Sequence, residues 1–209
     1  MNKMEAIRAR HSVRRYKDQS LDAKTISALR VEILSCNRES GLNIQLVVNE
    51  PKAFDGFMAH YGKFSGVKNY IALIGKKGPD LDEKCGYYGE RLVIKAQQMG
   101  LNTCWVALTY SKVKTAFQVE KGEKLCLVIA LGYGETQGTA HHSKPMDKVS
   151  GMESVLLAPT AMNQQKFLFT LKGDRVSAKA GLGFYSKVDL GIAKYHFELG
   201  AGRENFMWD

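Results

Sequence analysis

The sequence predicts an α+β fold in which helices surround a sheet with both hairpin and crossover connections. Helical and strand-like segments interleave along the whole chain, a pattern typical of a mixed or antiparallel sheet covered by helices. Two strand-like segments, 166–171 and 175–179, flank the turn Lys172-Gly173-Asp174 and predict a hairpin. The 209 residues suffice for one substantial core, or for two small halves packed as one unit.

In the first part of the chain we expect three helices and two strands. The first helix covers 4–10, Ser20 or Asp22 caps the second, and Pro51 opens the third. The strands cover 43–48 and 69–74. The helical spacing of four residues predicts the buried face of the second helix: Ile26, Leu29, Ile33 and Leu34. The third helix contains the large apolar residues Phe54, Phe57 and Met58.

In the rest of the chain, glycines and capping residues mark the expected helix ends. A helix over 88–99 stops at Gly100, and the last helix, over 188–199, stops at Gly200. Between them we expect an extended segment over 103–108, a helix capped by Ser111, an apolar strand over 124–131, and a helix opened by the capping box Ser150-Gly151-Met152-Glu153.

Composition and charge limit the function classes. The apolar (44%) and charged (24%) fractions are those of an ordinary soluble protein, and no apolar run is long enough to span a bilayer. The start lacks the apolar core of a signal peptide, so we expect a cytoplasmic protein without a membrane partner. The net charge of +9 permits a nucleic-acid partner, but the basic residues are spread along the chain and no nucleic-acid motif organises them. We therefore expect none.

The cysteines and histidines do not predict a metal site. The four cysteines form no C-x-x-C pair, and Cys104 and Cys126 lie in apolar surroundings, so we expect buried free thiols. His141 and His142 are adjacent, and no histidine spacing typical of metal ligands occurs.

Two segments carry the chemistry. Arg10-His11-Ser12-Val13-Arg14-Arg15-Tyr16 combines guanidiniums, an imidazole and a hydroxyl after a helix, a set that can hold a phosphate. Its alternative is a solvated basic helix end with weak surface ion pairs. Ala158-Pro159-Thr160-Ala161-Met162-Asn163-Gln164-Gln165 is a turn of small residues followed by amides, which can read the edge of a flat polar ring. Its alternative is a helix-to-strand loop whose amides satisfy backbone groups.

Together the two segments resemble the flavin mononucleotide (FMN) site of the nitroreductase family. The first is similar to the family's I-x-x-R-[RH]-S-V-R-x-[FY] and the second to its A-P-S-x-x-N-x-Q. Gly100-Leu101-Asn102-Thr103-Cys104-Trp105-Val106 resembles G-L-G-x-x-W-[IL], and Leu131-Gly132-Tyr133-Gly134 resembles the strand end before the basic tail. The ending Asp189-Leu190-Gly191-Ile192-Ala193-Lys194-Tyr195-His196-Phe197-Glu198-Leu199-Gly200 resembles a sub-family of Thermotoga type.

The resemblance implies roles for individual residues. Arg10, His11, Ser12 and Arg14 would hold the phosphate, ribityl chain and pyrimidine edge, with Arg14 beside the atoms that gain negative charge on reduction. The remaining implied contacts are the phosphate clamp His142 and Lys144, the backbone of Val106, Ala107 and Leu108 at the flavin N5 and O4, and Pro159, Thr160, Ala161, Asn163 and Gln165 on the opposite side.

The order of the motifs suggests two halves. In typical members the P-S-x-x-N motif lies early and reaches the flavin of the other subunit of a homodimer, whereas here it lies near the end. The early equivalent, Leu34-Ser35-Cys36-Asn37, has no proline. The segments 32–48 and 153–169 also repeat one order of elements, although chance could produce that. We therefore expect one unit, 1–209, with possible halves 1–148 and 149–209 around one FMN, as a monomeric pseudo-dimer or a homodimer.

The implied activity is hydride transfer from NADH or NADPH through FMN to a small oxidised acceptor such as a nitroaromatic or a quinone, with ping-pong kinetics. The sequence contains no G-x-G-x-x-G motif, so we do not expect a separate nicotinamide-binding domain. Lys166-Phe167 replaces the usual Pro-Trp and Asn102 the usual glycine, which bears on access to the flavin. Two alternatives stay open: a flavin protein of the same fold with other chemistry, such as reductive dehalogenation or flavin cleavage, and a basic binding module without enzymatic activity.

Overall fold

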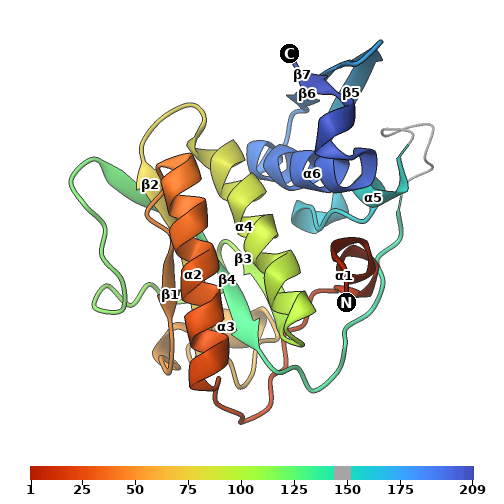
Figure 1. Ribbon diagram of the computed structural model, residues 1–209. Coiled ribbons are helices and arrows are strands. Elements are labelled where there is room, and N and C mark those ends of the chain that lie inside the picture. The colour runs from red at the N-terminus through yellow and green to blue at the C-terminus, as the bar shows by residue number, and fades with distance from the viewer. Residues whose placement is uncertain (144–151) are drawn as a thin grey trace.

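The computed structural model describes residues 1–143 and 152–209 (Figure 1). The described part before residue 144 contains α1 (Lys3–Ala9), α2 (Ala23–Ser40), β1 (Gln45–Val47), the 3₁₀ turn η1 (Lys52–Phe54), α3 (Phe57–Tyr61), β2 (Asn69–Lys76), α4 (Leu81–Gln98), β3 (Asn102–Val106) and β4 (Glu123–Gly132). The part after residue 151 contains α5 (Glu153–Leu156), η3 (Ala161–Asn163), β5 (Phe167–Lys172), β6 (Arg175–Ala180), α6 (Ser186–Ala201), η4 (Arg203–Asn205) and β7 (Met207–Trp208). None of the described helices is long and apolar enough to cross a membrane.

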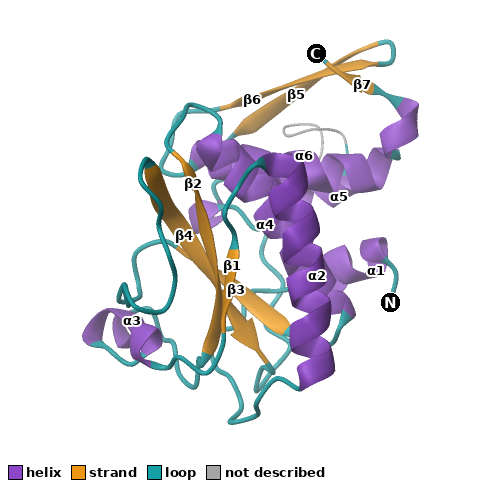
Figure 2. Cartoon of the chain, turned by 60° about the vertical axis from the view of Figure 1, so that its left-hand side comes forward, coloured by secondary structure: helices purple, strands orange, loops and turns teal. Residues whose placement is uncertain are grey.

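The main sheet is antiparallel throughout, with the strand order β1-β2-β4-β3. Seven of the eight β2 residues are buried, because both faces of the sheet are covered. Helices α2 and α4 cover one face (Figure 2). The other face packs an aromatic cluster in which Phe54 contacts Phe64 and Tyr70 edge to face.

A smaller sheet, β5-β6-β7, packs against α6. The strands β5 and β6 form the expected hairpin, and β7 adds in parallel to β6. Phe169 stacks on Phe197 of α6 with ring centroids 5.0 Å apart, and Phe206 and Trp208 complete the cluster. The C-terminus is therefore held by aromatic packing.

The helices α4 and α6 cross at two glycines. A Cβ added at Gly86 would lie 2.0 Å from the Val188 carbonyl oxygen, and one added at Gly191 would lie 2.0 Å from the Glu83 carbonyl oxygen. Only glycine permits this approach, so the crossing fixes how the C-terminal segment sits on the rest of the molecule.

The helix-and-sheet architecture is confirmed, and most expected elements exist within a few residues. Asp22 is the residue that caps α2, accepting from the Thr25 N–H at 2.7 Å. Gly100, at φ +80°, follows α4 as expected. The capping box falls partly on Ser150 and Gly151, outside the described residues; Met152, which precedes α5, makes no side-chain cap hydrogen bond.

The helix expected after Ser111 is wrong. Val113, Ala116 and Phe117 have helical spacing, but they pack as coil against the aromatic face of the sheet. The Gln45 side chain holds this segment by accepting from the Gln118 N–H at 2.9 Å and donating to the Gln118 carbonyl at 2.6 Å. A distant amide thus overrides local helical spacing.

Other expectations were wrong in detail. Leu34 is exposed, and Cys36 takes its place on the buried face of α2. The helix expected from Pro51 is split into η1 and α3, and Phe57 and Met58 are exposed. The helix α6 runs past Gly200 and ends at Gly202, whose φ of +78° stops it. Helix α4 begins at Leu81, seven residues before the expected start.

Candidate functional site

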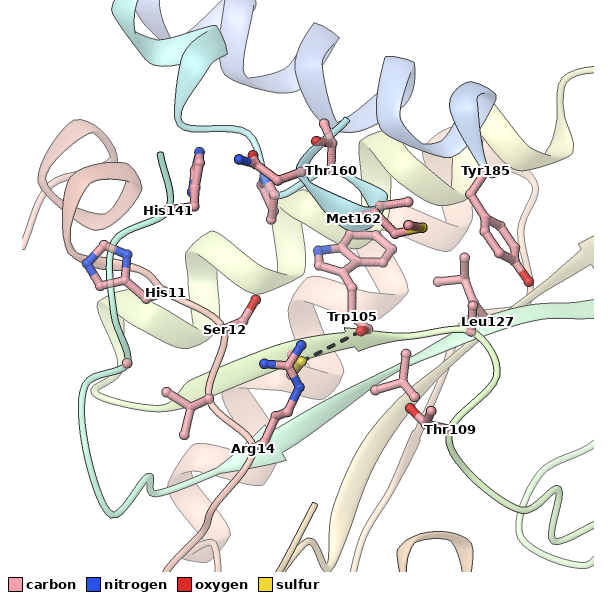
Figure 3. Close-up of a pocket in the computed structure, with 18 of the residues that line it drawn as sticks. His11, Ser12, Arg14, Trp105, Thr109, Leu127, His141, Thr160, Met162 and Tyr185 are labelled. Carbon is pink, nitrogen blue, oxygen red and sulfur yellow. Dashed lines mark hydrogen bonds between the residues drawn. The ribbon is translucent and has the colours of Figure 1, made fainter. Parts of the chain in front are cut away.

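A pocket of about 1190 Å³ lies where the two parts of the chain meet (Figure 3). One wall, wall A, consists of residues 10–15, and the other, wall B, of residues 159–163 with the start of α6. The end of β3 and the coil after it lie between them. Eleven of the residues expected from the sequence line this pocket: Arg10, His11, Ser12, Arg14, Val106, Ala107, Leu108, Pro159, Thr160, Ala161 and Asn163.

Wall A is held by its backbone. The Val13 N–H donates to the Thr103 carbonyl at 3.0 Å, and the Tyr16 N–H donates to the Ser65 carbonyl at 3.0 Å. In an extended segment successive side chains point to opposite sides. Val13 is accordingly buried in the core, while Ser12 and Arg14 point outward along the pocket (Figure 3).

Arg10 is a buried cation at the base of wall A. Its side chain is 4% exposed and donates to the Leu157 carbonyl at 3.3 Å. Its Nε is buried and has no hydrogen-bond partner among the described residues. Burial lowers the pKa of this guanidinium, and the Glu90 carboxylate opposes that effect. A buried guanidinium N–H without an acceptor carries an energetic cost that an anionic or carbonyl ligand would remove.

Basic side chains outnumber acidic ones along the described lining of the pocket. Burial, Arg10 and His141 together lower the pKa of His11. His141 lines the pocket and contacts the Leu156 carbonyl oxygen through Nε2 at 3.0 Å. The described lining residues include the cations Arg10, Arg14, Arg15 and Lys63 against the single carboxylate Asp189. The field in the pocket therefore favours an anion.

Wall B is held by side chains. Asp189 of α6 accepts from the Ala161 N–H at 2.8 Å and from the Gln164 amide at 2.6 Å. Met162, Asn163 and Gln165 all have positive φ, so the turn at the end of residues 159–163 has left-handed backbone. Burial raises the pKa of Asp189 to about 6 although both hydrogen bonds favour the charged form.

Two of the expected residues brace wall B: Gln165, which does not line the pocket, and Asn163, which also lines it. The Gln165 amide is buried and donates to the Leu156 carbonyl at 2.9 Å, beside the Ser143 hydroxyl, which donates to the same carbonyl at 3.1 Å. The Asn163 amide donates to the His142 carbonyl at 2.6 Å. His142 is thus held through its backbone, and its neighbour His141 lines the pocket. Lys144 lies outside the described residues.

The far end of the pocket is apolar. Leu127 lies there (Figure 3), and the lining also includes the apolar side chains of Leu108, Val188 and Ile192. Tyr185, in a left-handed conformation at the start of α6, and Thr109 lie at the same end (Figure 3). The pocket thus has a cationic end for an anionic group and an apolar end for a ring.

Sequence reasoning missed several lining residues, among them Trp105, His141, Tyr185 and Asp189. Trp105 and Asp189 stood inside segments that resemble the family, yet nothing in their spacing indicated a role. Tyr185 had no signal, because a left-handed aromatic residue cannot be recognised from the sequence.

Solved structures with similar folds were found. A protein of Thermotoga maritima described as "a putative nitroreductase" has a TM-score of 0.64 and 23% identity, over 98% of this chain and 85% of that one. An FMN-dependent nitroreductase of Clostridium difficile has a TM-score of 0.55 and 17% identity, over 70% of this chain and 96% of that one. A nitroreductase of Desulfovibrio desulfuricans, also described as "putative" and solved in complex with FMN, has a TM-score of 0.54 and 15% identity, over 71% and 94%.

These likenesses establish the class of protein: the chain has the nitroreductase fold. The particular family follows from a family model described as "Putative TM nitroreductase", which matches residues 2–201. The chain belongs to that nitroreductase family. A comparison with curated proteins found no match.

Proposed function

We propose that this chain is an FMN-dependent oxidoreductase that accepts a hydride from NADH or NADPH and passes it to a small oxidised acceptor such as a nitroaromatic or a quinone. The observation that carries the proposal is the pocket between walls A and B, lined by Arg10, whose buried Nε has no hydrogen-bond partner among the described residues. Membership in the nitroreductase family and the FMN complex of the Desulfovibrio desulfuricans protein support it.

The residues present fit FMN. Its phosphate suits Arg10, His11 and His141, which supply donors and a positive field. The volume of about 1190 Å³ exceeds the usual size of a single ligand pocket, which leaves space for a second ligand beside the cofactor. The apolar end suits the ring of that second ligand.

The protein's part in the reaction is binding and polarisation. FMN, when bound, supplies hydride chemistry, so no side chain of this chain need act as acid or base. Arg14 is exposed along the pocket, and its guanidinium lies 5.9 Å from the centre of the Phe64 ring. A cation beside the pyrimidine edge stabilises negative charge there and favours reduction. Ser12, on the same side of wall A, would supply a hydroxyl to the same edge.

We further propose that the two possible halves, 1–148 and 149–209, enclose one FMN per chain. Wall A comes from the first half and wall B from the second. The FMN-dependent relative of Clostridium difficile matches 70% of this chain but 96% of its own length, which supports an added segment here. Asn37, the early equivalent of Asn163, holds both the N–H and the carbonyl of Ile44 and does not line the pocket, so the FMN contact falls to wall B.

The test is an anaerobic titration of the purified protein. FMN is added and the excess removed; the flavin absorbance then gives the stoichiometry, and NADH or NADPH is added without oxygen. We expect one FMN per chain, bleaching by a nicotinamide, and recovery of the absorbance with a quinone. Bound flavin that no nicotinamide bleaches would indicate other flavin chemistry. Absence of bound flavin would refute the proposal, and two FMN per chain would refute the enclosure by two halves.

A further inference from the structure

A buried carboxylate–imidazole pair joins the two parts of the chain directly behind the pocket. Glu90 of α4 and His196 of α6 both have side chains that are 0% exposed, and Glu90 Oε1 lies 2.9 Å from His196 Nε2. His196 Nδ1 lies 2.8 Å from the Ser154 carbonyl oxygen. The second carboxylate oxygen, Oε2, accepts from the Trp105 indole N–H at 2.9 Å. The function proposed above uses none of these contacts.

The hydrogen bonds fix the number of protons in this group. A carbonyl oxygen only accepts, so His196 Nδ1 carries a proton. One further proton is then shared between Nε2 and Glu90 Oε1, as imidazolium with carboxylate or as imidazole with carboxylic acid. The pair has no net charge in either form, which is the condition for burying it without a large desolvation cost. Both Glu90 oxygens have hydrogen-bond partners: Oε1 contacts His196 of the C-terminal part, and Oε2 contacts Trp105 of the N-terminal part.

The group ends on a ring that lines the pocket. The indole of Trp105 faces the pocket among the residues labelled in Figure 3. Its far edge lies over Gly89 of α4, where an added Cβ would be 2.4 Å from Cη2. The ring is therefore backed by helix backbone at one edge and bonded at its N–H, and these two contacts together fix its orientation.

We propose that Glu90 and His196 are positioning residues for Trp105, holding its indole as a flat wall against which the ring of FMN, or of the acceptor beside it, packs. The inference rests on the proposed function for the identity of that ring. His196 and Ser154 belong to the C-terminal part, and His196 contacts Glu90, which holds the indole N–H. The packing of α6 against α4 therefore determines where the indole lies. A role in stability alone would leave the indole orientation and ligand affinity unchanged in any variant that folds.

The experiment uses the chain's two tryptophans as separate reporters. In the Trp208→Phe protein only Trp105 emits, and in the Trp105→Phe protein only Trp208 emits. Glu90→Leu removes the tether at nearly constant volume. Glu90→Gln keeps an acceptor for the indole N–H and a donor for His196 Nε2. Trp208 donates to Glu198 Oε1 at 2.8 Å, so Glu198→Leu removes a matched tryptophan–glutamate bond away from the pocket.

We expect Glu90→Leu to increase acrylamide quenching of Trp105 at least twofold and to weaken FMN binding about tenfold, the loss typical of one hydrogen bond to a charged group. Quenching of Trp208 should not change. Glu90→Gln should restore both properties to within twofold, and Glu198→Leu should leave FMN affinity unchanged. In the Trp105→Phe background, Glu90→Leu should weaken FMN binding no further, because the two residues act in series.

Unchanged quenching and affinity in Glu90→Leu would overturn the inference, and so would a loss that Glu90→Gln fails to rescue. Failure of the unmodified protein to bind FMN would refute the proposed function, while the quenching of Trp105 would still decide whether Glu90 positions it. If Glu90→Leu does not fold, Glu90→Leu with His196→Leu removes both polar partners, and the same quenching comparison applies.

Discussion

Walls A and B bound the same pocket but are held by different means. Wall A is an extended segment whose backbone pairs with Thr103 and Ser65, while its outward side chains make few contacts of their own. Wall B has left-handed backbone at Met162 and Asn163 and is held by the side chain of Asp189. A backbone-held wall tolerates substitution of its outward side chains, whereas a wall held by one carboxylate moves when that carboxylate is lost. The predictions below test this difference.

The largest effect is expected where α6, which carries Asp189, crosses α4. Gly191→Ala would place a methyl group 2.0 Å from the Glu83 carbonyl oxygen, so backbone must move. We expect a loss of about 4 kcal/mol in the free energy of unfolding, measured by urea denaturation. Gly100→Ala is the control: it has positive φ but open space around it, and should cost about 1 kcal/mol. Equal losses in the two variants would contradict the close crossing.

The second prediction concerns the pH dependence of wall B. The pKa of Asp189 is raised from its ordinary value of 3.8 to about 6. Between these values the folded protein retains a proton that the unfolded chain has released, so the free energy of unfolding falls as pH rises from about 4 to 6 and then levels off. We expect Asp189→Asn to flatten this slope. The change in the free energy of unfolding between about pH 4 and 6 should be about 2–3 kcal/mol smaller in the variant than in the unmodified protein. Parallel pH profiles would show that Asp189 does not titrate in this range.

The third prediction concerns wall A and rests on the proposed FMN site. Arg10→Met keeps the volume and removes the charge and the unpartnered Nε. We expect FMN affinity to fall 10- to 100-fold, because a charge-assisted hydrogen bond is lost. Arg8→Met, at an exposed surface ion pair with Glu153, should change affinity less than twofold. Isothermal titration calorimetry measures both, and equal affinities in the two variants would remove Arg10 from the site.

The smallest effect is expected at Met162, whose side chain is 94% exposed and whose φ is +50°. Met162→Gly relieves left-handed strain but adds freedom to the unfolded chain, so we expect a gain of about 0.5 kcal/mol in the free energy of unfolding. The matched substitution in wall A, Ser12→Gly, has no such strain to relieve, so it should lower the free energy of unfolding. Thermal denaturation compares the two, and a loss in Met162→Gly would indicate that wall B carries no net strain.

The sequence anticipated wall A better than wall B, for a physical reason. Arg10, Ser12 and Arg14 alternate with period two in an extended segment, so their spacing alone puts Ser12 and Arg14 on one side. In wall B the segment was found, but Asp189 lies inside a helix 25 residues beyond Gln164 and looks like an ordinary helix position. Side-chain bonds between distant residues leave no local pattern.

Errors in the fold have the same origin. Gly86 lowers helix propensity in the first two turns of α4, which the expected helix omitted, yet close packing with α6 is what this glycine permits. After Ser111 the spacing was helical, but a hydrogen bond from the distant Gln45 side chain held the segment as coil. Local rules failed in both places because tertiary contacts were stronger.

The glycine crossing of α4 and α6 has a genetic consequence. Gly86 and Gly191 meet the opposing helices reciprocally, each with its own α-carbon against a backbone carbonyl of the other, as in an interface between two identical subunits. In a symmetric dimer one codon specifies both sides of such a contact, and a single mutation alters both together. Here two codons specify Gly86 and Gly191, so each glycine can be substituted independently of the other. A mutation in either codon is enough to separate the helices.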